Sequence, residues 1–262
     1  MKFIRPTGRN ALGHRFRIPT RLLVFATLAG LFASPANALP SYARQTGADC
    51  RACHVGSFGP QLTRFGQQFK LGGYTESDEN GVKIPLSAMA VANWTRTAKA
   101  NPDHPENFNN NNAALQEASL FLAGRLTDHI CTFAQGTFSG IEKKSALDQM
   151  DIRYADTLKL GESEGVVGLS FNNNPAFADP FNILGQWRFP YTSSDLGFGN
   201  GPSPLVESLG GSVLGLNAYT LWNKNFYAEL GAYNTPSINT LNALNATDAG
   251  KFSGVGTYGR VA

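Results

Sequence analysis

Five consecutive residues carry the clearest chemistry in the sequence: Cys50-Arg51-Ala52-Cys53-His54. A C-x-x-C-H run is the attachment site of a c-type haem. Two thiols one short turn apart can each bond a haem vinyl group, and the adjacent imidazole then lies below the iron as its proximal ligand. The motif therefore predicts one covalent haem c, bound through Cys50 and Cys53, with His54 as the proximal iron ligand.

Two other kinds of site use closely spaced cysteines: a zinc half-site and a thioredoxin-like redox pair. Zinc needs a second pair of ligands, and the only other cysteine, Cys131, lies far along the chain. A redox pair needs no histidine directly after its second cysteine. Haem attachment accounts for all three reactive residues of the motif.

The motif does not give the sixth ligand of the haem iron. Beyond the first 38 residues the chain offers Met89, Met150, His104 and His129. A methionine thioether raises the reduction potential relative to a second imidazole, which suits the acceptance of electrons from Fe(II). Met89 is nearest to the motif in sequence and is the predicted distal ligand. The alternative is that Met89 is an ordinary strand residue. An open sixth position would instead indicate ligand binding or peroxidase chemistry.

Residues 1–38 have the pattern of an export signal. They carry six basic and no acidic residues, a short apolar core of twelve residues from Leu22 to Ala33, and the cleavage site Ala36-Asn37-Ala38. Such a core is too short to span a bilayer, which favours a cleaved signal over an uncleaved anchor. Covalent haem attachment takes place outside the cytoplasm in bacteria, so the signal and the haem motif support each other.

Removing the leader changes the sign of the net charge. The whole chain has 22 basic and 19 acidic residues, a net charge of +3, whereas residues 39–262 keep sixteen basic and all nineteen acidic residues, a net charge of −3. A basic chain would suggest nucleic acid or an anionic membrane surface as partner. Because the basic excess belongs to the leader, no nucleic-acid partner is expected.

Residues 39–85 form one compositional unit, which we expect to be a small α-helical domain around the haem. The unit is too short to build a strong core unaided, and a covalent haem would supply the apolar centre that it lacks. Apolar residues at helical spacing predict a helix from Pro60 to Lys70, ended by Gly72-Gly73.

Residues 86–262 predict an antiparallel β-sheet. Segments of about ten residues alternate apolar and polar side chains, separated by connections rich in Asn, Gly, Pro and Asp. Leu120 and Leu122, for example, share one face of a strand, while Glu117 and Arg125 share the other. The predicted strands are Leu86–Thr97, Leu115–Leu126, Ile130–Gly140, Met150–Leu160, Glu164–Phe171, Val213–Trp222, Phe226–Tyr233 and Gly254–Ala262.

The predicted connections alternate in length. Long ones are expected at 99–112, 141–149, 172–212 and 235–253, and tight ones at 127–129, 161–163 and 223–225. Outer-membrane β-barrels have short periplasmic turns and long extracellular loops, whereas a soluble β sandwich has no reason to sort its loops. We therefore expect a barrel whose charged residues, such as Arg153 and Lys159, face a polar lumen, with Leu, Val and Tyr facing lipid. A secreted soluble β domain is the alternative.

Further runs accompany the haem motif: LPSYARQTG at 39–47, PQLTRFG at 60–66, FKLGGY at 69–74, LDQMDIRYA at 147–155 and NNNP at 172–175. Together with the motif they resemble the outer-membrane cytochrome–porin fusions, a family that includes the monohaem iron oxidases of iron-oxidising bacteria. The resemblance implies a haem domain lodged in or under a barrel mouth, passing electrons across the outer membrane. It also implies three partners: outer-membrane lipid, an extracellular donor such as Fe(II), and a periplasmic carrier, either a cytochrome or a copper protein.

The chain departs from this family at its end. The fusions have larger barrels, and bacterial outer-membrane strands usually finish on an aromatic residue, whereas this sequence stops at Arg260-Val261-Ala262. A closed eight-stranded barrel fills its lumen with its own side chains and leaves little room for a haem domain. We therefore expect an incomplete barrel in a C-terminally truncated member of the family. An eight-stranded barrel with the haem segment outside is the alternative.

These features together predict a mainly β, exported outer-membrane protein that carries one haem c and transfers single electrons, with the character of an iron oxidase. Its expected organisation is a signal peptide (1–38), a monohaem cytochrome c domain (39–85) and a porin-like barrel (86–262). Two other functions stay open: a porin whose haem domain is a plug or sensor, and a peroxidase-type haem protein. No further catalytic constellation stands out; Gly161–Gly168 lacks the lysine of a phosphate-binding loop.

Overall fold

The computed structural model describes residues 39–57, 59–81, 83–96, 112–184, 208–246 and 253–262. They belong to one compact unit, Ala38–Ala262. The predicted export signal and the loop that holds His104 lie outside the described residues.

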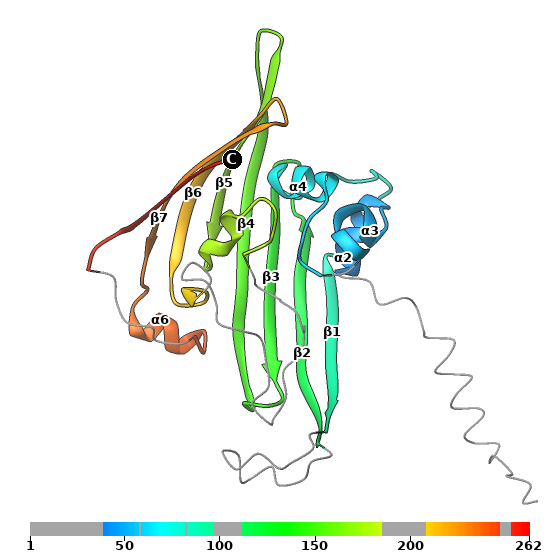
Figure 1. Ribbon diagram of the computed structural model, residues 1–262, viewed down its shortest axis with the longest axis vertical. Coiled ribbons are helices and arrows are strands. Elements are labelled where there is room, and N and C mark those ends of the chain that lie inside the picture. Colours follow the sequence, from blue (N-terminus) through cyan, green and yellow to red (C-terminus); the bar gives the residue numbers. More distant parts are fainter. Residues whose placement is uncertain (1–38, 58, 82, 97–111, 185–207, 247–252) are drawn as a thin grey trace, which may run out of the picture. The chain divides into compact units, whose positions relative to one another are not determined.

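Eight antiparallel strands form a single sheet in the order of the sequence (Figure 1). They are β1 (Leu86–Thr95), β2 (Asn112–Arg125), β3 (Ile130–Ser139), β4 (Lys144–Leu160), β5 (Ser163–Asn172), β6 (Leu214–Trp222), β7 (Phe226–Asn234) and β8 (Gly256–Val261). The eight predicted strands are all found, and the mainly β fold is confirmed. In the described part of the chain β1 and β8 are the two edges, so the sheet is open.

The helices are short and most of them precede the sheet. They are α2 (Pro40–Thr46), α3 (Cys50–Cys53), α4 (Arg64–Leu71) and α6 (Ile238–Ala243), with 3₁₀ turns η1 (Val55–Ser57) and η3 (Pro175–Ala178). No helix among the described residues is long and apolar enough to cross a membrane.

The helix α4 begins later than the sequence predicted. Its start is set by Thr63, whose side chain accepts a hydrogen bond from the backbone N–H of Gly66, three residues on, and so caps the first turn. The preceding Leu62 forms an isolated β-bridge with His54 instead of a helical turn. The predicted start at Pro60 is therefore wrong by one turn, because the bridge to the haem motif takes precedence over the helix.

One predicted long connection is also wrong. The loop expected at 141–149 is only 140–143, because β4 already begins at Lys144 and its first residues continue to pair with the end of β3. A register shift at Gln135/Gly136 accommodates this continued pairing.

The remaining connections keep their predicted lengths. Turns are short at 126–129, 161–162 and 223–225, and connections are long at 96–111, 173–213 and 235–255. Since successive connections of an antiparallel meander lie at opposite ends, all turns at one end are short and most connections at the other end are long. Leu86 pairs with Leu122 near the end of β2, so residues 39–85 join the sheet at the short-turn end.

The two faces of the sheet differ in polarity, and the inner face is the one that the helices and η3 cover. The strand pairing places many polar side chains on this inner face: Ser87, Ser119, Gln135, Thr137, Asp151, Arg153, Ser170, Asn172, Asn217 and Glu229. The outer face carries mostly large apolar side chains: Leu86, Trp94, Leu120, Leu122, Phe138, Ile152, Tyr154, Leu158, Leu169, Phe171, Leu216, Phe226 and Leu230.

Most tyrosines depart from the predicted outward orientation. Tyr219, Tyr227 and Tyr233 lie on the inner face and are buried. Their hydroxyls explain the difference, because they find partners there: that of Tyr219 donates to the Leu71 carbonyl at 2.8 Å, and that of Tyr227 to the Ala178 carbonyl at 3.2 Å. A buried phenol needs such a partner.

A buried ion pair connects the inner face to its cover. The Arg153 Nε lies 2.6 Å from the Asp151 Oδ2, and both side chains are almost fully buried. The remaining guanidinium donors reach the carbonyls of Phe177 at 2.9 Å and Lys70 at 3.4 Å. The second Asp151 oxygen accepts from the Ser170 hydroxyl at 2.6 Å. One arginine therefore binds together β4, α4 and η3.

We expect Arg153→Met to destabilise the fold by about 3–5 kcal/mol, because it leaves the Asp151 carboxylate buried without its partner. The free energy of unfolding, from denaturant titration, measures this. Replacing both residues (Asp151→Asn with Arg153→Met) should recover part of the loss. The matched control is Arg51→Met, which breaks only the exposed pair with Asp49 and should change nothing measurable. Equal unfolding midpoints for Arg153→Met and the unchanged protein would contradict the role of this pair.

Candidate haem site

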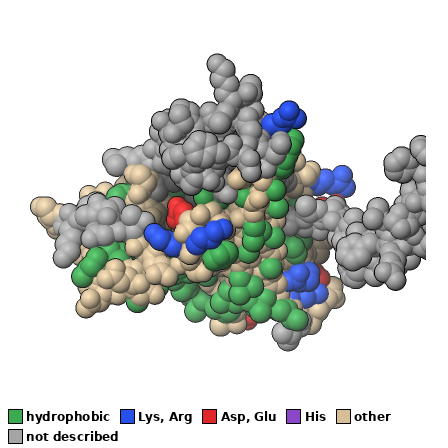
Figure 2. Space-filling view, turned by 90° about the horizontal axis from the view of Figure 1, so that it is seen from below, with side chains coloured by type: hydrophobic (Ala, Val, Ile, Leu, Met, Phe, Trp, Pro, Cys, Tyr) green, Lys and Arg blue, Asp and Glu red, His purple; other side chains and the backbone are tan. Residues whose placement is uncertain are grey.

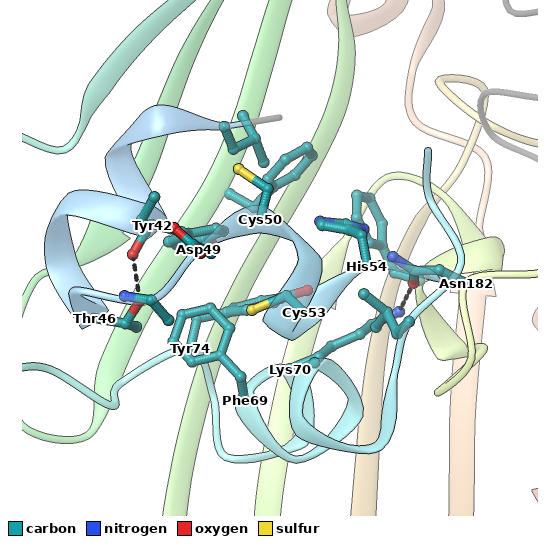
Figure 3. A pocket seen from close by; sticks show the side chains of 17 residues that line it. Tyr42, Thr46, Asp49, Cys50, Cys53, His54, Phe69, Lys70, Tyr74 and Asn182 are labelled. Atoms are coloured by element: carbon teal, nitrogen blue, oxygen red, sulfur yellow. Dashed lines mark hydrogen bonds between the residues drawn. The ribbon is translucent and has the colours of Figure 1, made fainter. Parts of the chain in front are cut away.

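The helix α3 carries both cysteines of the motif, at its first and last positions. His54 follows directly, and its backbone N–H donates to the Cys50 carbonyl at 2.8 Å, which closes the last turn. His54 itself has an extended backbone and forms the β-bridge with Leu62, and the turn η1 follows it. Cys50, Cys53 and His54 all line one cavity (Figure 3).

Close packing between α3 and α4 holds the motif in place. The backbone N–H of Thr63 donates to the Cys53 carbonyl at 2.9 Å, and the Thr63 hydroxyl donates to the carbonyl of Ala52. A Cβ atom on Gly66 would lie only 2.2 Å from the Cys53 carbonyl oxygen. Glycine at this position therefore allows α4 to pack directly on the last turn of α3.

The cavity is lined mainly by apolar and aromatic side chains. They come from α2, α4, the sheet and η3: Leu39, Tyr42, Leu62, Phe69, Tyr74, Phe133 and Phe177. The cavity has a volume of about 100 Å³ and is partly open to solvent.

Three aromatic rings form one wall of the cavity. Tyr42 stacks on Tyr74 at 5.4 Å between ring centroids, and Phe69 meets Tyr42 edge-on at 5.1 Å. The two phenol groups are anchored to the sheet: the Tyr42 hydroxyl donates to the Thr132 carbonyl at 3.0 Å, and that of Tyr74 to Asp151 at 3.1 Å. Burial raises the pKa of both tyrosines well above the ordinary value, so both remain protonated.

The imidazole of His54 has the properties of a metal ligand. Burial lowers its pKa, and the backbone carbonyls of residues 59–61 counteract only part of this effect. At neutral pH the ring is therefore neutral, the form that binds a metal. Its Nδ1 is buried without a hydrogen-bond partner. Burial likewise raises the pKa of Cys53, which keeps it a neutral thiol.

The residues present therefore fit a covalently held haem. Two sulfurs on one short helix, an adjacent neutral imidazole and an apolar aromatic cavity are what a c-type haem requires. Among the residues that the structure describes, no group of three or more His, Cys, Asp or Glu side chains is arranged to hold a metal ion by itself.

Lys70 is the unexpected member of the cavity lining. It lies on α4, is 2 % exposed, and donates to the Asp179 carbonyl at 2.7 Å and to Asn182 Oδ1 at 2.5 Å. Burial, with a smaller contribution from the nearby Arg153 guanidinium, lowers the pKa of Lys70 to about 7. The signal that the sequence offered was weak: Lys70 stands between two apolar residues, Phe69 and Leu71.

The structure does not bring Met89 to this cavity. Met89 lies on β1 opposite Ser119 and lines a separate groove, with Leu147 and Leu244 among its neighbours. Its role as distal ligand stays a prediction from the sequence.

The other sequence candidates also lie elsewhere. His129 is in the β2–β3 turn, where its Nδ1 is 3.3 Å from the Ala155 carbonyl. Met150 lies on β4. Cys131 is a buried residue of β3 that packs against Phe69 and Tyr74 but does not line the cavity.

Comparisons with protein-family models, with curated proteins and with solved structures found no match for this chain.

Replacing either Cys50 or Cys53 with alanine should remove one covalent bond to the haem, and replacing both should abolish attachment. The measurement is haem that stays with the polypeptide after denaturation, by haem-stained gel and alkaline pyridine spectrum. Cys131→Ala is the matched control and should keep the full haem content, because Cys131 is not part of the cavity lining. Equal haem retention in the double variant and in Cys131→Ala would refute the attachment site.

Proposed function

We propose that this chain is an exported outer-membrane electron-transfer protein that carries one covalent haem c. It takes single electrons from an extracellular donor such as Fe(II) and passes them to a periplasmic cytochrome or copper protein. The observation that carries the proposal is the cavity in which Cys50, Cys53 and His54 lie against the covered, polar face of the sheet. The identity of the donor rests on the family resemblance alone.

The chain's own residues would divide the work at the haem. The haem, when bound, supplies a one-electron Fe(III)/Fe(II) couple. Cys50 and Cys53 hold it covalently, and His54 supplies a neutral imidazole nitrogen to the iron. The aromatic wall of Tyr42, Phe69 and Tyr74 excludes water from the haem edge, and burial of this kind is one means by which a protein adjusts a reduction potential.

The polarity of the sheet supports a membrane location. Soluble antiparallel sheets bury an apolar face and expose a polar one, whereas here the polar face is covered and the apolar face is open. Leu120, Leu216 and Leu230 on the outer face are 59 %, 57 % and 70 % exposed. Figure 2 views the molecule from below, where hydrophobic side chains gather on part of the surface with a few Lys and Arg beside them. Exposed apolar surface of this extent marks an interaction site, and an outward apolar band is what a lipid-facing barrel wall presents.

The proposal includes closure of the sheet into a barrel. Unpaired backbone groups of an edge strand cannot face lipid, so in a membrane β1 and β8 both need a partner. The inner face would then line a lumen, partly filled by residues 39–85. These residues join the sheet at the short-turn end, which is the periplasmic end in outer-membrane barrels. That arrangement supports transfer from the haem to a periplasmic carrier.

A porin with a haem plug is the second candidate, and one observation favours it. Side chains and carbonyls of α4 bond directly to the inner face: the Leu71 carbonyl accepts from Tyr219, and Lys70 binds Asp179 and Asn182 beside η3. Such contacts would hold a plug as firmly as a redox domain. Ion conductance of the reconstituted protein separates the two, because an electron conduit should show redox turnover with little ion flux.

Single tryptophans report whether the outer face contacts lipid. With the native tryptophans replaced by phenylalanine, Leu169→Trp and Leu216→Trp should each be strongly quenched by brominated lipid in proteoliposomes. The matched control, Tyr219→Trp on the inner face of the same strand as Leu216, should be quenched far less. Equal quenching at residues 216 and 219 would contradict the proposed orientation.

Stopped-flow mixing of the haem-loaded protein with Fe(II), at several pH values, tests the electron-transfer function. We expect the haem to be reduced, with a six-coordinate spectrum that carbon monoxide does not alter. Absence of reduction would remove Fe(II) as donor, and rapid carbon monoxide binding would favour the peroxidase alternative.

A further inference from the structure

Few side chains in the cavity could bind the haem iron opposite His54. Besides the motif, the lining residues with polar side-chain atoms are Tyr42, Thr46, Asp49, Lys70, Tyr74 and Asn182. Within the described lining there is no methionine and no second histidine. A sixth ligand from this cavity therefore has to be one of these oxygen or nitrogen donors.

Most of these donors are committed elsewhere. Tyr42 and Tyr74 stay protonated and donate to Thr132 and Asp151. Asp49 is 74 % exposed and pairs with Arg51 at 3.2 Å. Neutral hydroxyl and amide oxygens, as on the two remaining oxygen donors, are ligands for hard cations rather than for haem iron.

The hydrogen bonds of Lys70 leave one position of its nitrogen unused. A neutral amine has two hydrogens and one lone pair, and both hydrogens are used by the Asp179 carbonyl and Asn182 Oδ1 (dashed line to Asn182 in Figure 3). An ammonium would have a third hydrogen; the further contact of the nitrogen among the described residues is with the Phe177 ring, whose centre lies 5.9 Å away. A neutral amine would have its lone pair at this third position, beside the Phe177 ring, which also lines the cavity.

The position of Lys70 on α4 also suits this role. Lys70 lies four residues after Gly66, the residue that packs on the Cys53 carbonyl. Residues four apart share one face of a helix, so Lys70 belongs to the face of α4 that is turned toward the haem motif.

We propose that the Lys70 amine is the sixth ligand of the haem iron, in place of Met89. This inference rests on the proposed haem and deepens it. The bond is a lone-pair donation from nitrogen to iron, with no change of oxidation state. Axial-ligand identity is a main determinant of haem potential, and a nitrogen pair should give a lower potential than a histidine–methionine pair.

Isotope labelling tests the ligand in the unaltered protein. Ferric protein grown with lysine labelled with ¹⁵N at the side chain should show a ¹⁵N coupling to the haem iron by electron–nuclear double resonance. Protein labelled at histidine serves as the positive control for His54. Histidine coupling without lysine coupling overturns this inference alone. Absence of covalent haem overturns the proposed function, and this inference with it.

Three variants add a second measurement. Lys70→Ala should lose the lysine coupling completely, change the ferric haem from low to high spin, and let the reduced haem bind carbon monoxide. Lys70→Met should restore six-coordination with a raised potential. Met89→Leu should leave coupling, spin state and potential unchanged. A loss of low-spin haem in Met89→Leu, with Lys70→Ala unaffected, would return the role to Met89.

Discussion

Charged side chains on the inner face of the sheet have to be neutralised where water does not reach them. Arg153 meets this requirement through Asp151, and its other donors end on carbonyls of α4 and η3. The rings of Tyr74 and Tyr219 lie 5.4 Å and 5.1 Å from the guanidinium carbon. Because an unpaired buried charge is so costly, the helices cannot move from the sheet without breaking this set. The contacts of Arg153 therefore also hold α4, and with it one wall of the cavity, in place.

The alternation of side chains along each strand separates the polar inner face from the apolar outer face. In a strand, successive side chains point to opposite faces, so a strand that places charged and hydroxyl groups inward has only its alternate positions left for the other environment. On β4, Asp151 and Arg153 alternate with Ile152 and Tyr154. The polar inner face and the apolar outer face thus both follow from one alternating pattern.

Much of this fold could be predicted from the sequence because its signals are local. Alternation located the strands, and the C-x-x-C-H spacing located the cysteines and His54. The misplaced elements depended on distant partners: β4 extends through 144–149 because β3 accepts it past a register shift, and Tyr219 turns inward because the Leu71 carbonyl lies there. Lys70 finds Asp179 and Asn182 more than a hundred residues away. No local pattern encodes that proximity.

The same difference between local and distant signals applies to the two sides of the proposed haem site. The proximal side consists of five neighbouring residues, so its chemistry can be read from spacing alone. The distal side is assembled from α4 and the segment around η3, which the fold of the sheet brings together. Nearness to the motif in sequence therefore favoured Met89 as the distal ligand. Lys70 is favoured instead because it lines the same cavity as the motif. If the proposed haem is bound, its reduction potential would depend on this distal ligand and so on the tertiary structure as well as on the motif.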